Sequence, residues 1–358
     1  MTRDIAAQTR KLWLQCFDDT EEFVDMYFEQ RYRKENNMFE TEQGAVVAAL
    51  QMIHYPMTLF GGIAGISYVS GACTHPDYRN RGLMSRLLQR TLLRAWHNRA
   101  ALSALIPAEL WLFDYYARMD YAPVYTCRRY TFTLQPATVR QPERVLTNAA
   151  EPTLVRHKTF DREAYRYLKS RLLQRPCCVQ HTEADFRVIL ADLEVSHGRL
   201  FTLRLPTEQD KHHAPVALAI LYPDASSRAW RVDELTADTP AYARRLLSLI
   251  CGELHVDALS VTLPAEAGEA EEPTGMARII HLPALLRQYA AYRPEADMHL
   301  HVTDPRIPVN SGYYSLRSGQ LVHSRQPAAE TAYTAVTIGQ LTRRLFAGER
   351  AYMSLMLN

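Results

Sequence analysis

Hydrophobic residues recur at two different spacings in the first part of the chain. Over residues 83–96, leucine, methionine and finally tryptophan occupy every third or fourth position, with serine, glutamine and arginine on the other face, which predicts an amphipathic helix. Shorter, almost continuous apolar runs predict buried strands. The expected strands are 45–55, 63–73, 101–106 and 124–134, and the expected helices are 12–28, 83–96 and 114–118. This order predicts a mixed α/β domain over residues 1–135.

A second domain is expected over residues 151–275. Residues 135–150 contain Pro136 and Pro142 and show little apolar periodicity, so we interpret them as a linker. Beyond them, Thr239 followed by Pro240 is typical of a helix start. The expected helices are 163–171, 183–193 and 240–252, and the expected strands are 200–205, 216–222, 230–235 and 255–263. The strand, helix, strand order of residues 230–263 repeats that of residues 71–106.

A third unit, over residues 276–358, is predicted after an acidic stretch at 265–275 that we expect to be a loop. It begins with a helix at 282–290 and continues with three strands at 299–302, 312–316 and 320–324. Thr337 and Gln340 form a capping box that predicts the start of a last helix. The apolar tail, residues 351–358, is expected to be buried, because free termini are ordinarily polar and frayed.

Composition narrows the function classes. The 358 residues include 41 Lys and Arg against 39 Asp and Glu, a formal net charge of +2, which gives no reason to expect a nucleic-acid or membrane partner. No apolar run is long enough for a membrane span, and none follows the N-terminus as a signal peptide would, so a cytoplasmic protein is expected. The six cysteines contain no Cys-x-x-Cys pair, which favours buried thiols over a metal site.

The most specific chemical signal lies between the strand at 63–73 and the long helix. Five of the 14 glycines fall between residues 61 and 82, and none between 83 and 197. At the helix start, Gly82 lets the backbone approach a ligand, the first helical amides are unpaired, and Arg79 and Arg81 add positive charge. We interpret this segment as an anion site that a diphosphate would fit.

Charge is distributed unevenly along the chain. Residues 78–108 hold six arginines and no acid, while residues 18–29 hold six acids and no Lys or Arg. These two segments would suit an anionic donor and a cationic acceptor, respectively. Each segment is also compatible with an ordinary solvated helix face, which is the interpretation we prefer for Arg86, Arg90 and Arg94.

The motif Pro76-x-x-Arg79-x-x-Gly82 resembles the acetyl-CoA signature of the GNAT acyltransferases, with Met84 where that pattern has a small residue. Residues 114–121 resemble a later GNAT segment, with Asp120 in place of its glycine. The whole chain is similar to the enhanced intracellular survival (Eis) type of acetyltransferase. That resemblance implies two GNAT-type mixed-sheet domains, the second degenerate, followed by an α+β domain like the sterol carrier proteins.

The resemblance also implies roles for individual residues. Tyr116 matches the general acid of the family, and the main-chain carboxylate of Asn358 would be the base. The second domain is not expected to bind CoA, because Asp233, Glu234 and Asp238 stand at its equivalent junction. The residues expected to bind acetyl-CoA are Ala72, Cys73, Thr74, Arg79, Asn80, Arg81, Gly82, Leu83, Met84 and Ser85.

The leading hypothesis is therefore an acetyl-CoA-dependent N-acetyltransferase that acts on a primary amine, such as a polycationic small molecule or a lysine side chain. The alternative is a non-catalytic CoA-binding or ligand-binding regulatory protein of the same fold. No metal is expected, and the resemblance implies a homo-oligomer, often a hexamer.

Overall fold

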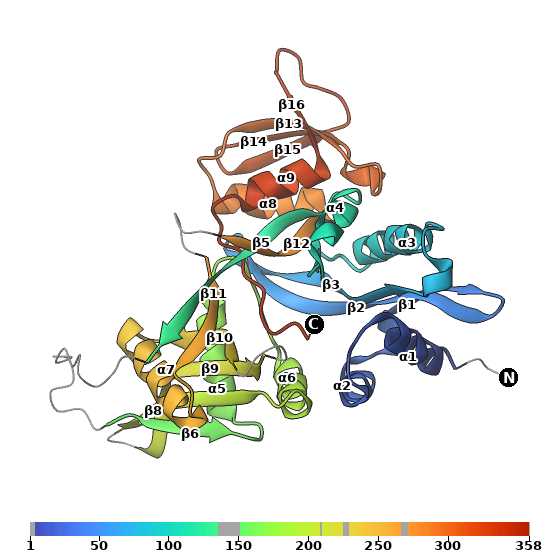
Figure 1. The fold of residues 1–358 in the computed structure, drawn as a ribbon. Helices are drawn as coiled ribbons and strands as arrows, with labels where there is room; N and C mark the ends of the chain where they lie inside the picture. The colour runs from blue at the N-terminus through green and yellow to red at the C-terminus, as the bar shows by residue number, and fades with distance from the viewer. Residues whose placement is uncertain (1–3, 135–150, 208–209, 225–228, 266–270, 358) are drawn as a thin grey trace.

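The structure is a computed structural model that describes residues 4–134, 151–207, 210–224, 229–265 and 271–357. The predicted linker at 135–150 and Asn358 lie outside these ranges. Within them, the chain forms one large mixed sheet and one smaller sheet, with helices packed on both, so the predicted mixed α/β class is confirmed. Figure 1 shows three lobes that meet near the centre of the molecule.

The first lobe contains the four strands and the two later helices predicted for residues 1–134, with some differences at their ends. Helix α3 packs on one face of β2 and β3, and α1 and α2 lie on the other (Figure 1). Parallel pairing of β3 with β4 across α3 confirms the strand, helix, strand order. The elements are α1 (Ile5–Cys16), α2 (Glu21–Met26), a π-helical turn (Tyr27–Arg31), β1 (Asn37–Glu42), β2 (Ala45–Leu59), β3 (Gly62–Thr74), α3 (Leu83–His97), β4 (Leu102–Leu105), α4 (Leu110–Ala117) and β5 (Ala122–Thr133).

The second lobe repeats this unit. Strands β10 and β11 are parallel and are joined by α7, which Thr239 caps through its side chain with Pro240 at the first position, as predicted. The elements are β6 (Thr153–His157), α5 (Arg162–Leu173), β7 (Cys178–Val179), α6 (Glu183–Val195), β8 (Arg199–Thr207), β9 (Asp210–Pro223), β10 (Trp230–Ala237), α7 (Pro240–Leu254) and β11 (Ala258–Pro264). Strands β6 and β7 were not predicted, because each is short and pairs with residues far away in the sequence.

The third lobe has a four-stranded sheet of order β15-β14-β13-β16. The predicted meander is confirmed, and the capping box of Thr337 and Gln340 starts α9. One face of the sheet buries Leu300, Val302 and Tyr314 in a core shared with both helices of this lobe. The elements are α8 (Leu282–Tyr292), β13 (Met298–Thr303), β14 (Gly312–Arg317), β15 (Gln320–Ser324), β16 (Thr334–Thr337) and α9 (Ile338–Phe346).

The main sheet joins the first two lobes through a strand that the sequence interpretation misplaced. Its order is β1-β2-β3-β4-β12-β5-β11-β10-β9-β8-β6, with β7 paired to β2. Strand β12 (Glu272–Ile279) lies between β4 and β5 and is antiparallel to both. Part of the predicted loop at 265–275 is therefore strand, and residues 276–279, expected to open the third unit, complete the sheet of the first.

Residues 12–28 also differ from the prediction of a single helix. The chain leaves the helical conformation at Phe17, and Thr20 caps a new helix by accepting a hydrogen bond from the amide of Phe23. In the connecting segment, the carboxylate of Asp19 accepts a hydrogen bond of 2.7 Å from the indole of Trp13. The connecting segment places Asp18 and Asp19 at a central cavity, whereas Glu21, Glu22 and Asp25 stay exposed.

Strand β3 carries a bulge next to the segment expected to bind the cofactor. Ala49 pairs with Cys73 and Gln51 with Ser70, so two residues of β3 oppose Leu50 alone. Gly71, the first of the two, has a φ of +59°, the left-handed conformation that such bulges require. A side chain at this position would run into the ring of Trp13.

We expect Gly71→Ala to destabilise the protein by about 3 kcal/mol, because it adds left-handed strain to overpacking against Trp13. Chemical denaturation followed by far-ultraviolet circular dichroism measures this cost. The matched control is Gly252→Ala within α7, where an added Cβ meets no neighbour, so the variant is expected to be neutral or more stable. Equal stability of Gly71→Ala and the parent would contradict the packing argument.

Candidate active site

The segment from Arg79 to the first turn of α3 has the geometry of an anion-binding site, and we call this segment the cradle. Gly82 is the N-cap in the left-handed conformation, with φ +70°, and no side chain caps the helix. Asn80 is also left-handed, with φ +62°. The first amide paired within the helix is that of Arg86, which donates to the carbonyl of Gly82, so the amides of the first turn point outward. This geometry fits a phosphate group, as the sequence predicted.

The arginines around this cradle differ in how far they are neutralised. The guanidinium of Arg81 lies over the ring of Tyr78 and 3.7 Å from the carboxylate of Glu42, and Arg90 pairs with Glu40 at 2.8 Å. Arg79 instead donates to the carbonyl of Thr74, at 3.2 Å. The basic segment at 78–108 is therefore partly neutralised by acids of β1.

Arg86 is exposed, as expected for a solvated helix face, and it also lies beside the cradle. Its guanidinium folds back and donates a hydrogen bond of 3.1 Å to the carbonyl of Arg81. The same guanidinium lies 3.4 Å from where a Cβ on Gly82 would be. Its position four residues after Gly82, one turn along the helix, explains this contact.

The end of β3 brings residues 72–74 against both α1 and the cradle. The thiol of Cys16, at the end of α1, and the guanidinium of Arg79 both donate to the carbonyl of Thr74. Hydrogen bonding to the thiol of Cys73 and the positive charge of Arg79 lower the pKa of Cys16 to about 7, against the opposing effect of burial. The Cys73 thiol is buried, and its pKa is raised well above the ordinary value.

Tyr116 lies on α4 in a cluster of tyrosines. Its ring is 7% exposed and is in edge contact with the rings of Tyr115 and Tyr121. Burial raises the pKa of the Tyr116 phenol above its ordinary value, with smaller contributions from the two neighbouring tyrosines. Tyr115 contacts the cradle through a hydrogen bond of 3.3 Å with Ser85, so α4 and the start of α3 are directly connected.

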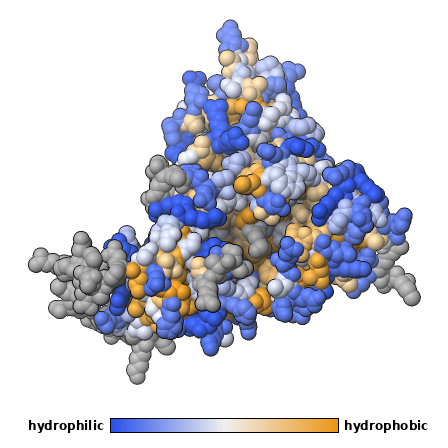
Figure 2. All heavy atoms as spheres, in the orientation of Figure 1, coloured by the Kyte–Doolittle hydropathy of each residue, from blue (hydrophilic) through white to orange (hydrophobic). Residues whose placement is uncertain are grey.

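A cavity of about 840 Å³ lies where the three lobes meet, and Figure 2 shows the surface hollowed at this place. The connection between α1 and α2 and the start of α4 form one side, and the second lobe forms the other. The apolar tail runs down from the third lobe to the centre (Figure 1), and residues 352–357 line the cavity. The tail is largely buried, as predicted, and Leu357 is its last described residue.

Carboxylates dominate the polar lining of the cavity. Two of them are neutralised, because Glu272 pairs with Arg129 and Asp233 with Arg231. Four others have no cationic partner among the residues that the structure describes, namely Asp18, Asp19, Glu109 and Asp192. The cavity is therefore suited to a cation.

Asp192 is the most buried of these carboxylates and comes from α6 of the second lobe. It accepts hydrogen bonds from the hydroxyl of Tyr222 at 2.6 Å and from that of Ser196 at 3.0 Å. Burial raises the pKa of its carboxyl above the ordinary value. Sequence reasoning missed Asp192, because nothing in the local pattern of α6 places it beside residues 18 and 19.

The acids at 233–238 do not face a common ligand site, which corrects the sequence interpretation. Glu234 is fully buried and pairs with Arg175 at 2.8 Å. It also accepts a hydrogen bond of 2.6 Å from Ser354 of the tail, so its role is to anchor the tail. Asp238 pairs on the surface with Arg171.

In the described part of the chain, no group of three His, Cys, Asp or Glu side chains is arranged to hold a metal ion. None of its helices is both long and apolar enough to cross a membrane.

Comparison with known families identifies two domains. Residues 1–124 match an acetyltransferase (GNAT) domain, and residues 282–356 match a sterol carrier protein domain. A comparison with curated proteins gives no significant match.

Solved structures share the fold over nearly the whole chain. A GCN5-related N-acetyltransferase from Anabaena variabilis has a TM-score of 0.73 at 15% identity, covering 96% of this chain and 87% of that one. One from Kribbella flavida has a TM-score of 0.68 at 17% identity, covering 100% and 96%. Eis1 from Mycobacterium abscessus has a TM-score of 0.67 at 14% identity, covering 97% and 88%.

The chain thus contains an acetyltransferase (GNAT) domain over residues 1–124 and a sterol carrier protein domain over residues 282–356. Its overall fold is similar to that of Eis1 from Mycobacterium abscessus, as the sequence resemblance implied.

We expect Cys16 to react with iodoacetamide with a midpoint near pH 7, because its pKa is lowered to about 7. The buried Cys177 and Cys178, whose pKa values are raised to about 12, are expected to remain unmodified. Arg79→Gln should move the Cys16 midpoint upward, since it removes a positive charge beside the thiolate, and added CoA should slow the reaction. Peptide mass spectrometry measures each rate, and a midpoint above 8.5, the ordinary value for cysteine, would contradict this account of the site.

Proposed function

We propose that the protein is an acetyl-CoA-dependent N-acetyltransferase whose acceptor is a primary amine on a polycationic molecule. The observation that carries this proposal is the junction of an anion cradle, at the start of α3, with an acidic cavity of about 840 Å³ at the centre of the molecule. A small polycation or a lysine side chain could enter this cavity, whose volume is that of a typical small-molecule site.

The acetyl donor, acetyl-CoA, would be bound by the cradle and by the bulged strand β3. The unpaired amides at the start of α3, with Arg79 and Arg86, would hold the pyrophosphate of CoA. Residues 72–74, directly after the bulge at Gly71, would offer backbone groups to the pantetheine arm and the thioester. This binding would hold the thioester in place for direct attack by the amine.

Tyr116 is the proposed acid. Direct transfer forms the amide bond to the amine nitrogen and breaks the bond to sulfur, so the departing CoA thiolate needs a proton. Because burial raises the pKa of Tyr116, its phenol stays protonated across the physiological range and can donate that proton.

The proton of the attacking ammonium must go to a base. The family resemblance gives this role to the main-chain carboxylate of Asn358, which lies outside the described residues, so the assignment stays a prediction. The anchoring of the tail by Glu234 and the position of Leu357 at the cavity support it. The expected homo-oligomer also stays a prediction.

We expect Tyr116→Phe to lower kcat by about a hundredfold, the usual size of a general-acid contribution, while the affinity for acetyl-CoA stays unchanged. Release of CoA thiol with a panel of polyamines, aminoglycosides and lysine peptides measures kcat. In the parent protein, kcat should show no alkaline decline below about pH 10, because the pKa of Tyr116 is raised above the usual phenol value. Binding of CoA without thiol release for any amine would refute the enzyme and favour a regulatory CoA-binding protein.

The unpaired carboxylates of the cavity predict charge selectivity for the acceptor. Asp192→Asn and Asp19→Asn should each raise KM for a diamine by about tenfold, since each removes one attraction in a partly buried site. KM for a monoamine of the same length should change less. The matched control is Glu21→Gln, an exposed acid of α2 that does not line the cavity. Equal effects on both amines, or an equal effect of the control, would contradict the assignment of the acceptor site.

A further inference from the structure

The three residues that directly follow α4, residues 118–120, contact β12 and the third lobe. The carbonyl of Arg118 accepts a hydrogen bond from Arg306, at 3.4 Å. The carbonyl of Met119 accepts one from Nε of Arg278, at 2.9 Å. Asp120 packs against Gly339 at the start of α9, where an added Cβ would lie 3.0 Å from the carbonyl oxygen of Asp120. Two guanidinium groups thus cap the carbonyl end of the helix that carries Tyr116.

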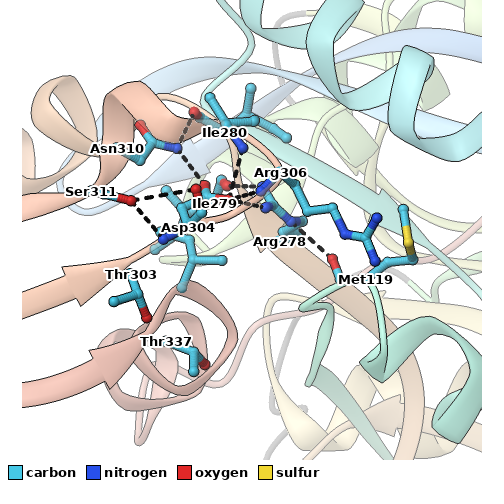
Figure 3. A network of polar contacts seen from close by, with 12 residues as sticks. Met119, Arg278, Ile279, Ile280, Thr303, Asp304, Arg306, Asn310, Ser311 and Thr337 are labelled. Carbon is cyan, nitrogen blue, oxygen red and sulfur yellow. Dashed lines mark hydrogen bonds and ion pairs between the residues drawn. The ribbon is translucent and has the colours of Figure 1, made fainter.

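Arg278 is itself fixed by the third lobe, as Figure 3 shows. Its Nη2 lies 2.6 Å from the carboxylate of Asp304, and both side chains are completely buried. Asp304 also accepts hydrogen bonds from the amides of Arg306 and Ile307 and from the side chain of Asn310. The loop that follows β13 is therefore organised around the carboxylate that orients Arg278.

This network is one turn away from Tyr116. The carbonyl of Tyr116 accepts hydrogen bonds from the amides of Met119 and Tyr121, at 2.9 and 3.3 Å. Asp120, between these two residues, is in the left-handed conformation with φ +62°, so the chain reverses there and brings Tyr121 back against the Tyr116 ring. A shift in the position of Met119 would therefore move the turn that fixes the Tyr116 backbone and the ring beside it.

We propose that Arg278 and Arg306 are positioning residues for Tyr116, and that through them the sterol carrier protein domain holds the proton donor of the acetyltransferase domain in place. This inference rests on the proposed role of Tyr116 as the acid. It gives the third lobe a function in the transfer reaction that requires no lipid ligand.

A double-mutant cycle tests the inference. Arg306→Gln and Arg278→Lys should each lower kcat by about tenfold while leaving KM for acetyl-CoA within about twofold. The only side chain of α3 that Arg306 bonds in the described residues is Gln89, at 3.3 Å, which lies beyond the first turn of the helix that forms the cradle. In a Tyr116→Phe background, the same substitutions should change kcat by less than about twofold, since the group they position is absent. Equal losses in both backgrounds would show a merely structural role and overturn the proposal.

The control and a second readout separate this proposal from the proposed function. Arg317→Gln removes an arginine of the same lobe that pairs on the surface with Asp297, and it should leave kcat unchanged. With 3-fluorotyrosine at position 116, the fluorine resonance should shift in Arg306→Gln and not in Arg317→Gln, whether or not any amine is acetylated. Arg306 is only partly buried, so this variant keeps the test available even if Arg278→Lys fails to fold. An unshifted resonance in Arg306→Gln would overturn the positioning role.

Discussion

The placement of β12 between β4 and β5 is the constraint on which the rest of the structure depends. In the described sheet, β4 and β5 are joined through this strand alone, although it follows β5 by more than a hundred residues and comes after the entire second lobe. Each of its edges satisfies the backbone groups of one neighbour. The acetyltransferase lobe is therefore complete only when the chain has passed through the second lobe and returned. Because β12 leads directly into α8, the same strand attaches the third lobe.

This constraint explains which parts of the fold the sequence could predict. Helices α3 and α7 and the strands beside them follow from local periodicity and local capping, so they were predicted closely. Strand β12 was not predicted, because the acidic composition around Glu272 and Pro273 indicates a loop, and the partner strands are distant in sequence.

The prediction of a single helix over residues 12–28 was wrong for a different reason. The apolar residues of this segment do form helices, but Thr20 caps a second helix and so interrupts the first. The hydrogen bond from Trp13 to Asp19 stabilises this break.

The same division holds for the candidate site. The cradle lies in one continuous segment, so the glycine, the helix start and Arg79 could be recognised together. Asp192 and Glu234 depend on contacts between lobes, and their surroundings cannot be deduced from neighbouring residues. Glu234 shows how a charge pattern can mislead, since an acid that seemed suited to repel a phosphate is buried against Arg175 and holds the tail. Arg86 is exposed, as predicted, but its bond to the carbonyl of Arg81 depends on a side-chain conformation that the local pattern does not reveal.

The two departures from the family motif have physical consequences of different kinds. At position 120 the backbone is left-handed, which a glycine adopts without strain and which aspartate tolerates better than most residues. The carboxylate of Asp120 gains a further contact, because the amide of Gly339 at the start of α9 lies beside it, and acids are stabilised at helix N-termini. Burial nevertheless raises its pKa, so the contact offsets only part of the desolvation. Met84 is partly buried, and its flexible side chain packs against the hydrophobic core that also contains Tyr116. Neither substitution removes the amides of the first turn of α3, so the departures affect how lobes and core fit together and leave the cradle in place.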